Sequence, residues 1–222
     1  MEGVLTATKA EAVYQELRAG ILDGSLPPGS WLDQKALAAE YVVSTTPVRE
    51  ALRRLAAEQL VVVRAHHGPR VSPLSVQELH YLFQVRLELD PLAGRLAAEL
   101  ASDEDRARVR RLYESNGSAD ERVVTNRAFH RAIYEACGNP VLVEVLQSLW
   151  NRCDRYRFLL TDSHDRAHAA QEEQDHHDMA IALEKGDGDR LHELLRGHIA
   201  RSYENLVALA TEFTSLSPAV GE

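Results

Sequence analysis

The hydrophobic pattern divides the chain into two parts with different secondary structure. In the first part, apolar residues recur at helical spacing in three short segments, and a β-branched run over residues 60–64 is followed by a predicted turn over residues 66–69 and a returning strand from Arg70. The second part shows helical periodicity throughout, with breaks near Gly138 and Gly186. The helices expected are residues 9–22, 34–41, 44–60, 75–100, 103–115, 119–137, 140–160, 163–185 and 189–213.

The helix over residues 44–60 determines how the first part is interpreted. It buries Val48, Leu52 and Leu55, begins with hydroxyl residues and Pro47 in its first turn, and carries Arg49, Arg53 and Arg54 on its other face. A surface helix with solvated arginines is the alternative. The short connection over residues 42–44 and the basic hairpin that follows instead favour a winged helix-turn-helix, whose helix N-terminus and hairpin tip contact nucleic acid. We therefore expect a mostly α protein, with a winged helix-turn-helix DNA-binding domain over residues 1–73 and an antiparallel all-α bundle of six helices over residues 74–222.

Composition and charge limit the function further. The formal net charge is −9, and all of it arises from residues 74–222, because acidic and basic side chains balance in residues 1–73. A positive contact surface must therefore be local to the first domain, and the acidic bundle should stand away from DNA. The two cysteines are too few for a disulfide framework, and the sequence has neither a bilayer-long apolar run nor a signal peptide. These features predict a cytoplasmic protein with no membrane partner.

The histidines of the second part are candidate ligands. Asn126 and His130 lie one helical turn apart, His176 belongs to an apolar stripe, and His198 follows the leucines of the last long helix. A histidine on an apolar face is more often a hydrogen-bonded core residue than a ligand. Here three histidines and one amide would face the interior from three helices, which makes a shared site a reasonable hypothesis.

Two motifs in the first part carry a family resemblance. The stretch Leu26-Pro27-Pro28-Gly29 and the run from Thr46 to Leu55 (Thr-Pro-Val-Arg-Glu-Ala-Leu-Arg-Arg-Leu) resemble the DNA-binding domain of the GntR family of bacterial transcription regulators, over about residues 9–73. Two positions depart from the family pattern: Val42 replaces the usual glycine, and Thr45 replaces a common arginine. The resemblance, together with the arginine face of the helix, implies DNA contacts by Lys35, Thr45, Thr46, Arg49, Arg53, His67 and Gly68.

The second part resembles the FCD effector domain of the FadR-type branch of that family, with six helices and a VanR-like size. The resemblance covers about residues 74–210 and rests on the run from Arg86 to Ala93, on Phe129-His130, and on the histidines at positions 176 and 198. It implies a divalent metal ion, Zn²⁺ or Ni²⁺, held by Asn126, His130, His176 and His198, with Asn126 in place of the usual aspartate. A neutral amide should weaken metal binding and strengthen the attraction of the ion for an anionic ligand.

The function expected from both parts is that of a ligand-controlled repressor rather than an enzyme. A homodimer would bind a palindromic double-stranded operator, and a small carboxylic acid at the metal site would control that binding. Arg86 and Arg152 are candidates for clamping the acid, although Arg86 could instead pair with Asp90 one turn later. Two alternatives stay open: a metal-dependent hydrolase, for which no His-Glu-x-x-His signature is present, and a regulator with a purely structural metal.

Overall fold

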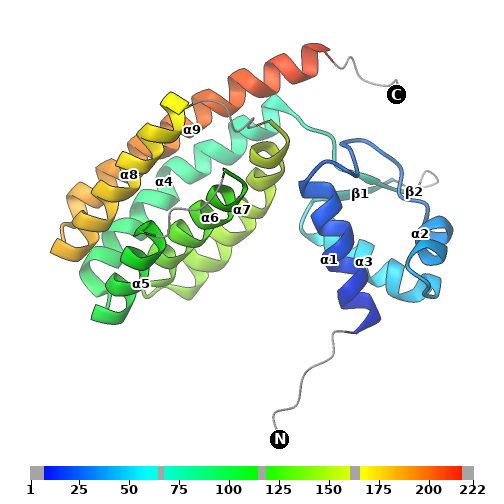
Figure 1. Ribbon diagram of the computed structural model, residues 1–222, viewed down its shortest axis with the longest axis horizontal. Coiled ribbons are helices and arrows are strands. Elements are labelled where there is room, and N and C mark those ends of the chain that lie inside the picture. Colours follow the sequence, from blue (N-terminus) through cyan, green and yellow to red (C-terminus); the bar gives the residue numbers. More distant parts are fainter. Residues whose placement is uncertain (1–7, 65–67, 115–118, 161–165, 217–222) are drawn as a thin grey trace, which may run out of the picture. The chain divides into compact units, whose positions relative to one another are not determined.

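The computed structural model describes residues 8–64, 68–114, 119–160 and 166–216. The chain divides into two compact units, residues 1–74 and 75–222 (Figure 1). Among the described helices, none combines the length and the apolar content needed to cross a bilayer.

The first unit is a three-helix domain with a β-hairpin. Its elements are α1 (Lys9–Leu22), α2 (Gln34–Glu40), α3 (Thr45–Ala57), β1 (Val61–Arg64) and β2 (Gly68–Val71). Helix α1 packs on α3, and Leu17, Val48 and Leu55 are completely buried between them. Thr8 caps α1 and Asp33 caps α2, each through a side-chain oxygen that accepts from the first-turn amides.

The hairpin differs from the sequence prediction in one detail. Gly68 and Pro69 were expected in the turn but belong to β2, where they pair with Arg64 and Val63. Proline is acceptable here because it sits near the start of a short strand, and its carbonyl accepts a hydrogen bond from the Leu32 amide at 2.9 Å. The other two residues of the predicted turn, at positions 66 and 67, lie outside the described residues.

The second unit is the six-helix bundle that the periodicity predicts. Its helices are α4 (Val76–Leu100), α5 (Asp103–Glu114), α6 (Ala119–Glu135), α7 (Pro140–Leu160), α8 (Arg166–Lys185) and α9 (Gly188–Leu216). Figure 1 shows α4 and α9 running side by side, and they form the most extensive helix pair of the unit. The start predicted for α8, at residue 163, falls among residues outside the described part, and the helix is observed from Arg166.

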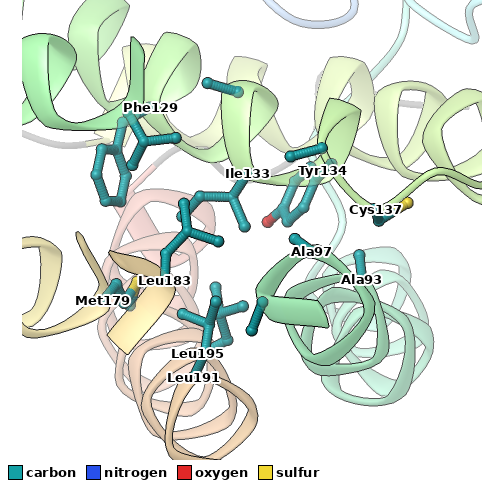
Figure 2. Packing of buried hydrophobic residues seen from close by; sticks show 14 of the residues in the cluster. Ala93, Ala97, Phe129, Ile133, Tyr134, Cys137, Met179, Leu183, Leu191 and Leu195 are labelled. Carbon is teal, nitrogen blue, oxygen red and sulfur yellow. The ribbon is translucent and has the colours of Figure 1, made fainter. Parts of the chain in front are cut away.

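The bundle core lies where α4, α6, α8 and α9 meet. Figure 2 shows Phe129, Ile133 and Tyr134 of α6 among side chains of the other three helices. Small residues of α4 allow α9 to approach closely: a Cβ atom at Gly94 would overlap the side chain of Leu195. Both cysteines are buried and unpaired, consistent with the absence of a predicted disulfide framework.

Candidate functional site

Helix α3 presents an exposed polar face and an open N-terminus. Thr46, Arg49 and Arg53 are exposed, and Thr45 is half-buried at the first helical position. Ser44 is the N-cap, but its side chain makes no capping hydrogen bond. The first-turn amides thus remain available, and such amides favour an anionic partner such as phosphate.

Arg54 has a different role from its two neighbouring arginines. Its Nη1 donates to Glu11 on α1 at 2.6 Å, and its guanidinium lies 3.8 Å from the centre of the Tyr14 ring. The expectation that all three arginines share the outer face is therefore wrong for Arg54, because this side chain folds back to tie α3 to α1. The exposed arginines of the helix are consequently Arg49 and Arg53.

The connection from α2 to α3 holds Val42 in the left-handed region, with φ 52°. The amides of Val42 and Val43 donate to the carbonyls of Ala39 and Ala38 at 3.3 and 2.9 Å, which is the double hydrogen bond of a Schellman helix end. Glycine usually occupies this position because a Cβ atom is strained there. Lys35 is exposed in the first turn of α2.

The hairpin tip is only partly described. Gly68 lies at its base with φ 81° and pairs with Arg64. His67, the other predicted wing contact, lies outside the described residues.

Three histidines from three helices converge inside the bundle. His130 (α6), His176 (α8) and His198 (α9) have ring centres 4.9 to 5.2 Å apart, and one ligand nitrogen of each lies within 4.8 Å of the others. His130 and His198 are almost fully buried. In the part of the chain that the structure describes, no carboxylate joins this cluster.

The Nδ1 atoms of His198 and His130 lie close to side chains that contact a buried carboxylate or are one. His198 Nδ1 lies 3.0 Å from a carboxylate oxygen of Asp175, and the same oxygen accepts from Arg201 at 2.5 Å. His130 Nδ1 lies 3.5 Å from the hydroxyl of Tyr134, which in turn donates to Asp90 at 2.8 Å. A proton held on Nδ1 leaves Nε2 with a free lone pair, which is the arrangement usual for metal-binding histidines.

Protonation of two of the three histidines is strongly disfavoured. Burial, together with the neighbouring His198, His176 and Arg157, holds the pKa of His130 well below its usual value. Burial and His198 lower the pKa of His176 to about 3. Although burial opposes it, hydrogen bonds from His198 and Arg201 keep the pKa of Asp175 well below the usual value. His130 and His176 are therefore neutral at pH 7 while Asp175 is ionised.

The donor set fits a divalent metal ion. The Nε2 atoms of His130 and His176 are buried and have no hydrogen-bond partner among the described residues, and unsatisfied polar atoms of this kind are costly unless something binds them. Neutral imidazole nitrogens are preferred ligands of Zn²⁺ and Ni²⁺. An ion held by the three histidines would satisfy both orphaned nitrogens.

The fourth predicted ligand, Asn126, has another partner. It is buried on α6 one turn before His130, and its amide oxygen, oriented to satisfy its hydrogen bonds, accepts from both terminal nitrogens of Arg157 at 3.1 and 3.2 Å. Arg157 was missed by the sequence reasoning, although it continues the buried stripe of α7 through Trp150 and Cys153 at helical spacing. Asp175 was also missed, because nothing local to α8 reveals its contact with α9.

Both arginines predicted to clamp a ligand are paired within the chain. Arg86 is almost fully buried, donates to Asp90 at 2.8 Å and lies 4.3 Å from the Trp150 ring centre, so the alternative of an intrahelical pair is the one observed. Arg152 pairs with Glu78 at 2.8 Å. Among the described residues, neither guanidinium forms a hydrogen bond with one of the three histidines, although the Arg86 charge contributes to the lowered pKa of His130.

Comparison with known proteins agrees with this two-part organisation. Residues 9–71 match the model described as bacterial regulatory proteins, gntR family, and residues 81–201 match the FCD domain. The chain is 34% identical to the uncharacterized HTH-type transcriptional regulator BphR of Paraburkholderia xenovorans, covering 86% of this chain and 82% of that protein. It is 30% identical to the HTH-type transcriptional repressor GlaR of Escherichia coli, covering 84% of this chain and 90% of GlaR.

A solved structure supports the same assignment. Escherichia coli McbR/YncC superposes with a TM-score of 0.76 at 27% identity, covering 91% of this chain and 99% of that one. The matched domains and relatives are those of transcription regulators and not of enzymes, which removes the support for a hydrolase. With a GntR-type head, an FCD-type bundle and relatives of the same organisation along most of its length, the chain belongs to the GntR family of bacterial transcriptional regulators.

Proposed function

We propose that this regulator is a repressor whose affinity for operator DNA is controlled by a small carboxylic acid bound at a metal site in the helical domain. The observation that carries the proposal is the convergence of His130, His176 and His198 in the bundle, the unit that does not contain α3. Two of these histidines have Nε2 atoms without a hydrogen-bond partner among the described residues. GlaR, a relative of similar length, is itself named a repressor.

The DNA-binding face would be formed by the exposed side of α3 and its flanks. Thr46, Arg49 and Arg53 share that side, and Lys35 and Thr45 lie at the starts of α2 and α3. Arginine can contact guanine edges or phosphates, and the uncapped amides of α3 suit a phosphate. His67 and Gly68 of the hairpin would add the wing contacts that the family resemblance implies.

A homodimer would present two such faces to a palindromic operator. The bundle supports this with exposed apolar side chains on two helices that pack against each other, Tyr81, Val85 and Leu92 on α4, and Val141 and Val145 on α7. Exposed apolar patches of this kind mark interaction surfaces. Sedimentation of the full chain should give a dimer, and Val85→Glu should shift it towards the monomer.

The metal, Zn²⁺ or Ni²⁺, would be held by the three imidazoles and would supply a Lewis acid for a carboxylate. The bundle provides no carboxylate ligand at the cluster within its described residues, so the ion would keep its full positive charge. Such a charge favours an anionic effector. The effector can weaken DNA binding only through a higher affinity for the form of the dimer that binds the operator poorly.

Fluorescence anisotropy with DNA from the upstream region of the gene tests this function. Zinc-loaded protein should bind with strong salt dependence, and Arg49→Ala should weaken binding about tenfold or more, whereas the exposed bundle variant Arg190→Ala should not. Absence of salt-sensitive binding would refute the DNA-binding role.

Effector control is tested in the same assay. Short mono- and dicarboxylic acids should release DNA from zinc-loaded protein but not from chelator-treated protein. If chelation lowers only the melting temperature and leaves every response unchanged, the metal is purely structural and the control proposed here is wrong.

A further inference from the structure

Three side chains beside the histidine cluster form a connected polar group. Asn126 accepts from the guanidinium of Arg157, and Arg157 Nη2 donates to Glu172 Oε1 at 2.5 Å. The group links α6, α7 and α8, two of which supply histidines of the cluster. Neither the family assignment nor the proposed function gives it a role.

Arg157 lies near the Trp150 ring, which is itself a neighbour of His130. Its guanidinium carbon lies 6.0 Å from the Trp150 ring centre, and that ring lies 5.1 Å from the ring of His130. The Arg157 charge also contributes to the lowered pKa values of His130 and His176. A positive charge is therefore held close to the place where a metal ion would bind.

The carboxylates near the cluster are already committed. Asp175 accepts from His198 and Arg201, and Asp90 accepts from Arg86 and Tyr134. A divalent ion held by the three histidines would thus gain no charge compensation from a ligating side chain of the described residues, and Arg157, although paired with Glu172, places a positive charge near it. Incompletely compensated charge in a buried site is costly, so the metal alone should bind weakly.

Glu172 shows where an external carboxylate could enter. It lines, with Asp175, His198 and Arg201, a small cavity of ≈ 10 Å³ between α8 and α9, which has room for about one water molecule while Glu172 is in place. An acid that approached His198 from this side would therefore have to displace Glu172, the side chain that now accepts from Arg157. Because the Glu172 side chain is also a carboxylate, a ligand carboxylate that took its place would form an equivalent charged hydrogen bond with Arg157.

We infer that Asn126 positions Arg157 rather than ligating the metal, and that the metal ion and a carboxylate ligand bind this chain cooperatively. The carboxylate of the ligand would replace Glu172 as the partner of Arg157 and would at the same time neutralise part of the charge of the ion. This inference rests on the proposed function, since it concerns the same metal site. An aspartate, usual in the family at this position, would itself neutralise part of the positive charge of the ion. With asparagine at position 126, that negative charge must come from the ligand. Metal affinity should therefore depend on the anion present.

Zinc affinity of the full chain, measured by competition with a chromophoric chelator, tests the inference. Acetate is the probe, compared with chloride at equal ionic strength and corrected for zinc complexed by acetate in solution. Wild type should bind zinc about tenfold more tightly in acetate, a coupling of ordinary size between two ligands. Asn126→Asp should bind zinc more tightly in chloride and gain less from acetate.

Two further variants identify the carboxylate receptor. Arg157→Gln should lose the acetate effect, and Glu172→Gln should enlarge it, because the internal competitor is gone. The neighbouring exposed Glu173→Gln is the matched control and should behave as wild type. Helix content is checked by circular dichroism, and if Arg157→Gln does not fold, the comparison of Glu172→Gln with Glu173→Gln decides.

The outcomes separate this inference from the proposed function. Equal zinc affinity in chloride and acetate for wild type, or an unchanged acetate effect in Glu172→Gln, overturns the cooperative binding while the metal site survives. If neither wild type nor Asn126→Asp binds zinc in either salt, the metal site itself is wrong.

Discussion

Replacing Val42 by glycine should stabilise the DNA-binding unit. Val42 follows the end of α2 with φ 52°, a left-handed conformation that costs an L-residue about 1–2 kcal/mol and that suits β-branched side chains least. The side chain is 85% exposed, so its removal sacrifices almost no buried apolar surface. The Schellman hydrogen bonds of this helix end involve only backbone atoms and would remain.

The expected gain follows from two opposing contributions. Relief of the left-handed strain favours the variant by about 1–2 kcal/mol, and the greater backbone freedom of glycine in the unfolded chain opposes it by about 0.5–1 kcal/mol. The free energy of unfolding should therefore rise by about 1 kcal/mol. Gln59→Gly, at the equivalent position after α3 with φ 59°, should gain less because glutamine is not β-branched.

Native-state hydrogen exchange of the full chain measures this change in the unit concerned. Amides of α3 that exchange by global opening of the unit, such as Leu55, should exchange about fivefold more slowly in Val42→Gly, the factor that corresponds to 1 kcal/mol. Val42→Ala keeps the Cβ atom and should show only part of the effect. Unchanged or faster exchange in Val42→Gly would refute the strain argument.

Three further predictions concern the bundle. In chelator-treated protein the melting temperature should fall as the pH is lowered from 6.5 to 4.5, because the imidazoles of the unfolded chain bind protons in this range while buried His130 and His176 do not. Each of the two histidines should lower the free energy of unfolding by about 1.4 kcal/mol per pH unit. A melting temperature that does not change with pH would contradict the lowered pKa values. Gly94→Val should lower the melting temperature strongly, because even a Cβ atom overlaps Leu195, and a wild-type melt would show that α4 and α9 can separate freely. Asp175→Asn should weaken zinc binding about 10- to 100-fold in the chelator competition, because the ring of His198 would no longer be held in place by a carboxylate. An unchanged zinc affinity would mean that Asp175 does not orient a metal ligand.

Local patterns were sufficient for most of the secondary structure. Capping residues and apolar periodicity predicted residues 9–22 and 140–160 with the bounds observed for α1 and α7. The hairpin was less accurate because a Gly-Pro pair is usually a turn signal, whereas here it begins a strand whose carbonyl bonds to a segment more than thirty residues earlier.

The surroundings of the candidate site depend on contacts that the sequence does not reveal. Arg54 and Glu11 are 43 residues apart, and His198 and Asp175 are 23 apart on different helices. Helical periodicity could predict that three histidines face inward, but not which charged residue stands behind each ring. The role of Asn126 likewise depended on Arg157, a residue of another helix.

The buried pair of Arg86 and Asp90 limits how this bundle can change over evolutionary time. The two side chains are 2% and 0% exposed, so replacing either one alone strands an uncompensated charge in the interior. Asp90 also accepts from Tyr134, and the loss of that acceptor would free the hydroxyl behind His130. Proteins that evolve from this chain should therefore either keep Arg86, Asp90 and Tyr134 or replace all three, and a substitution of only one of them should be rare.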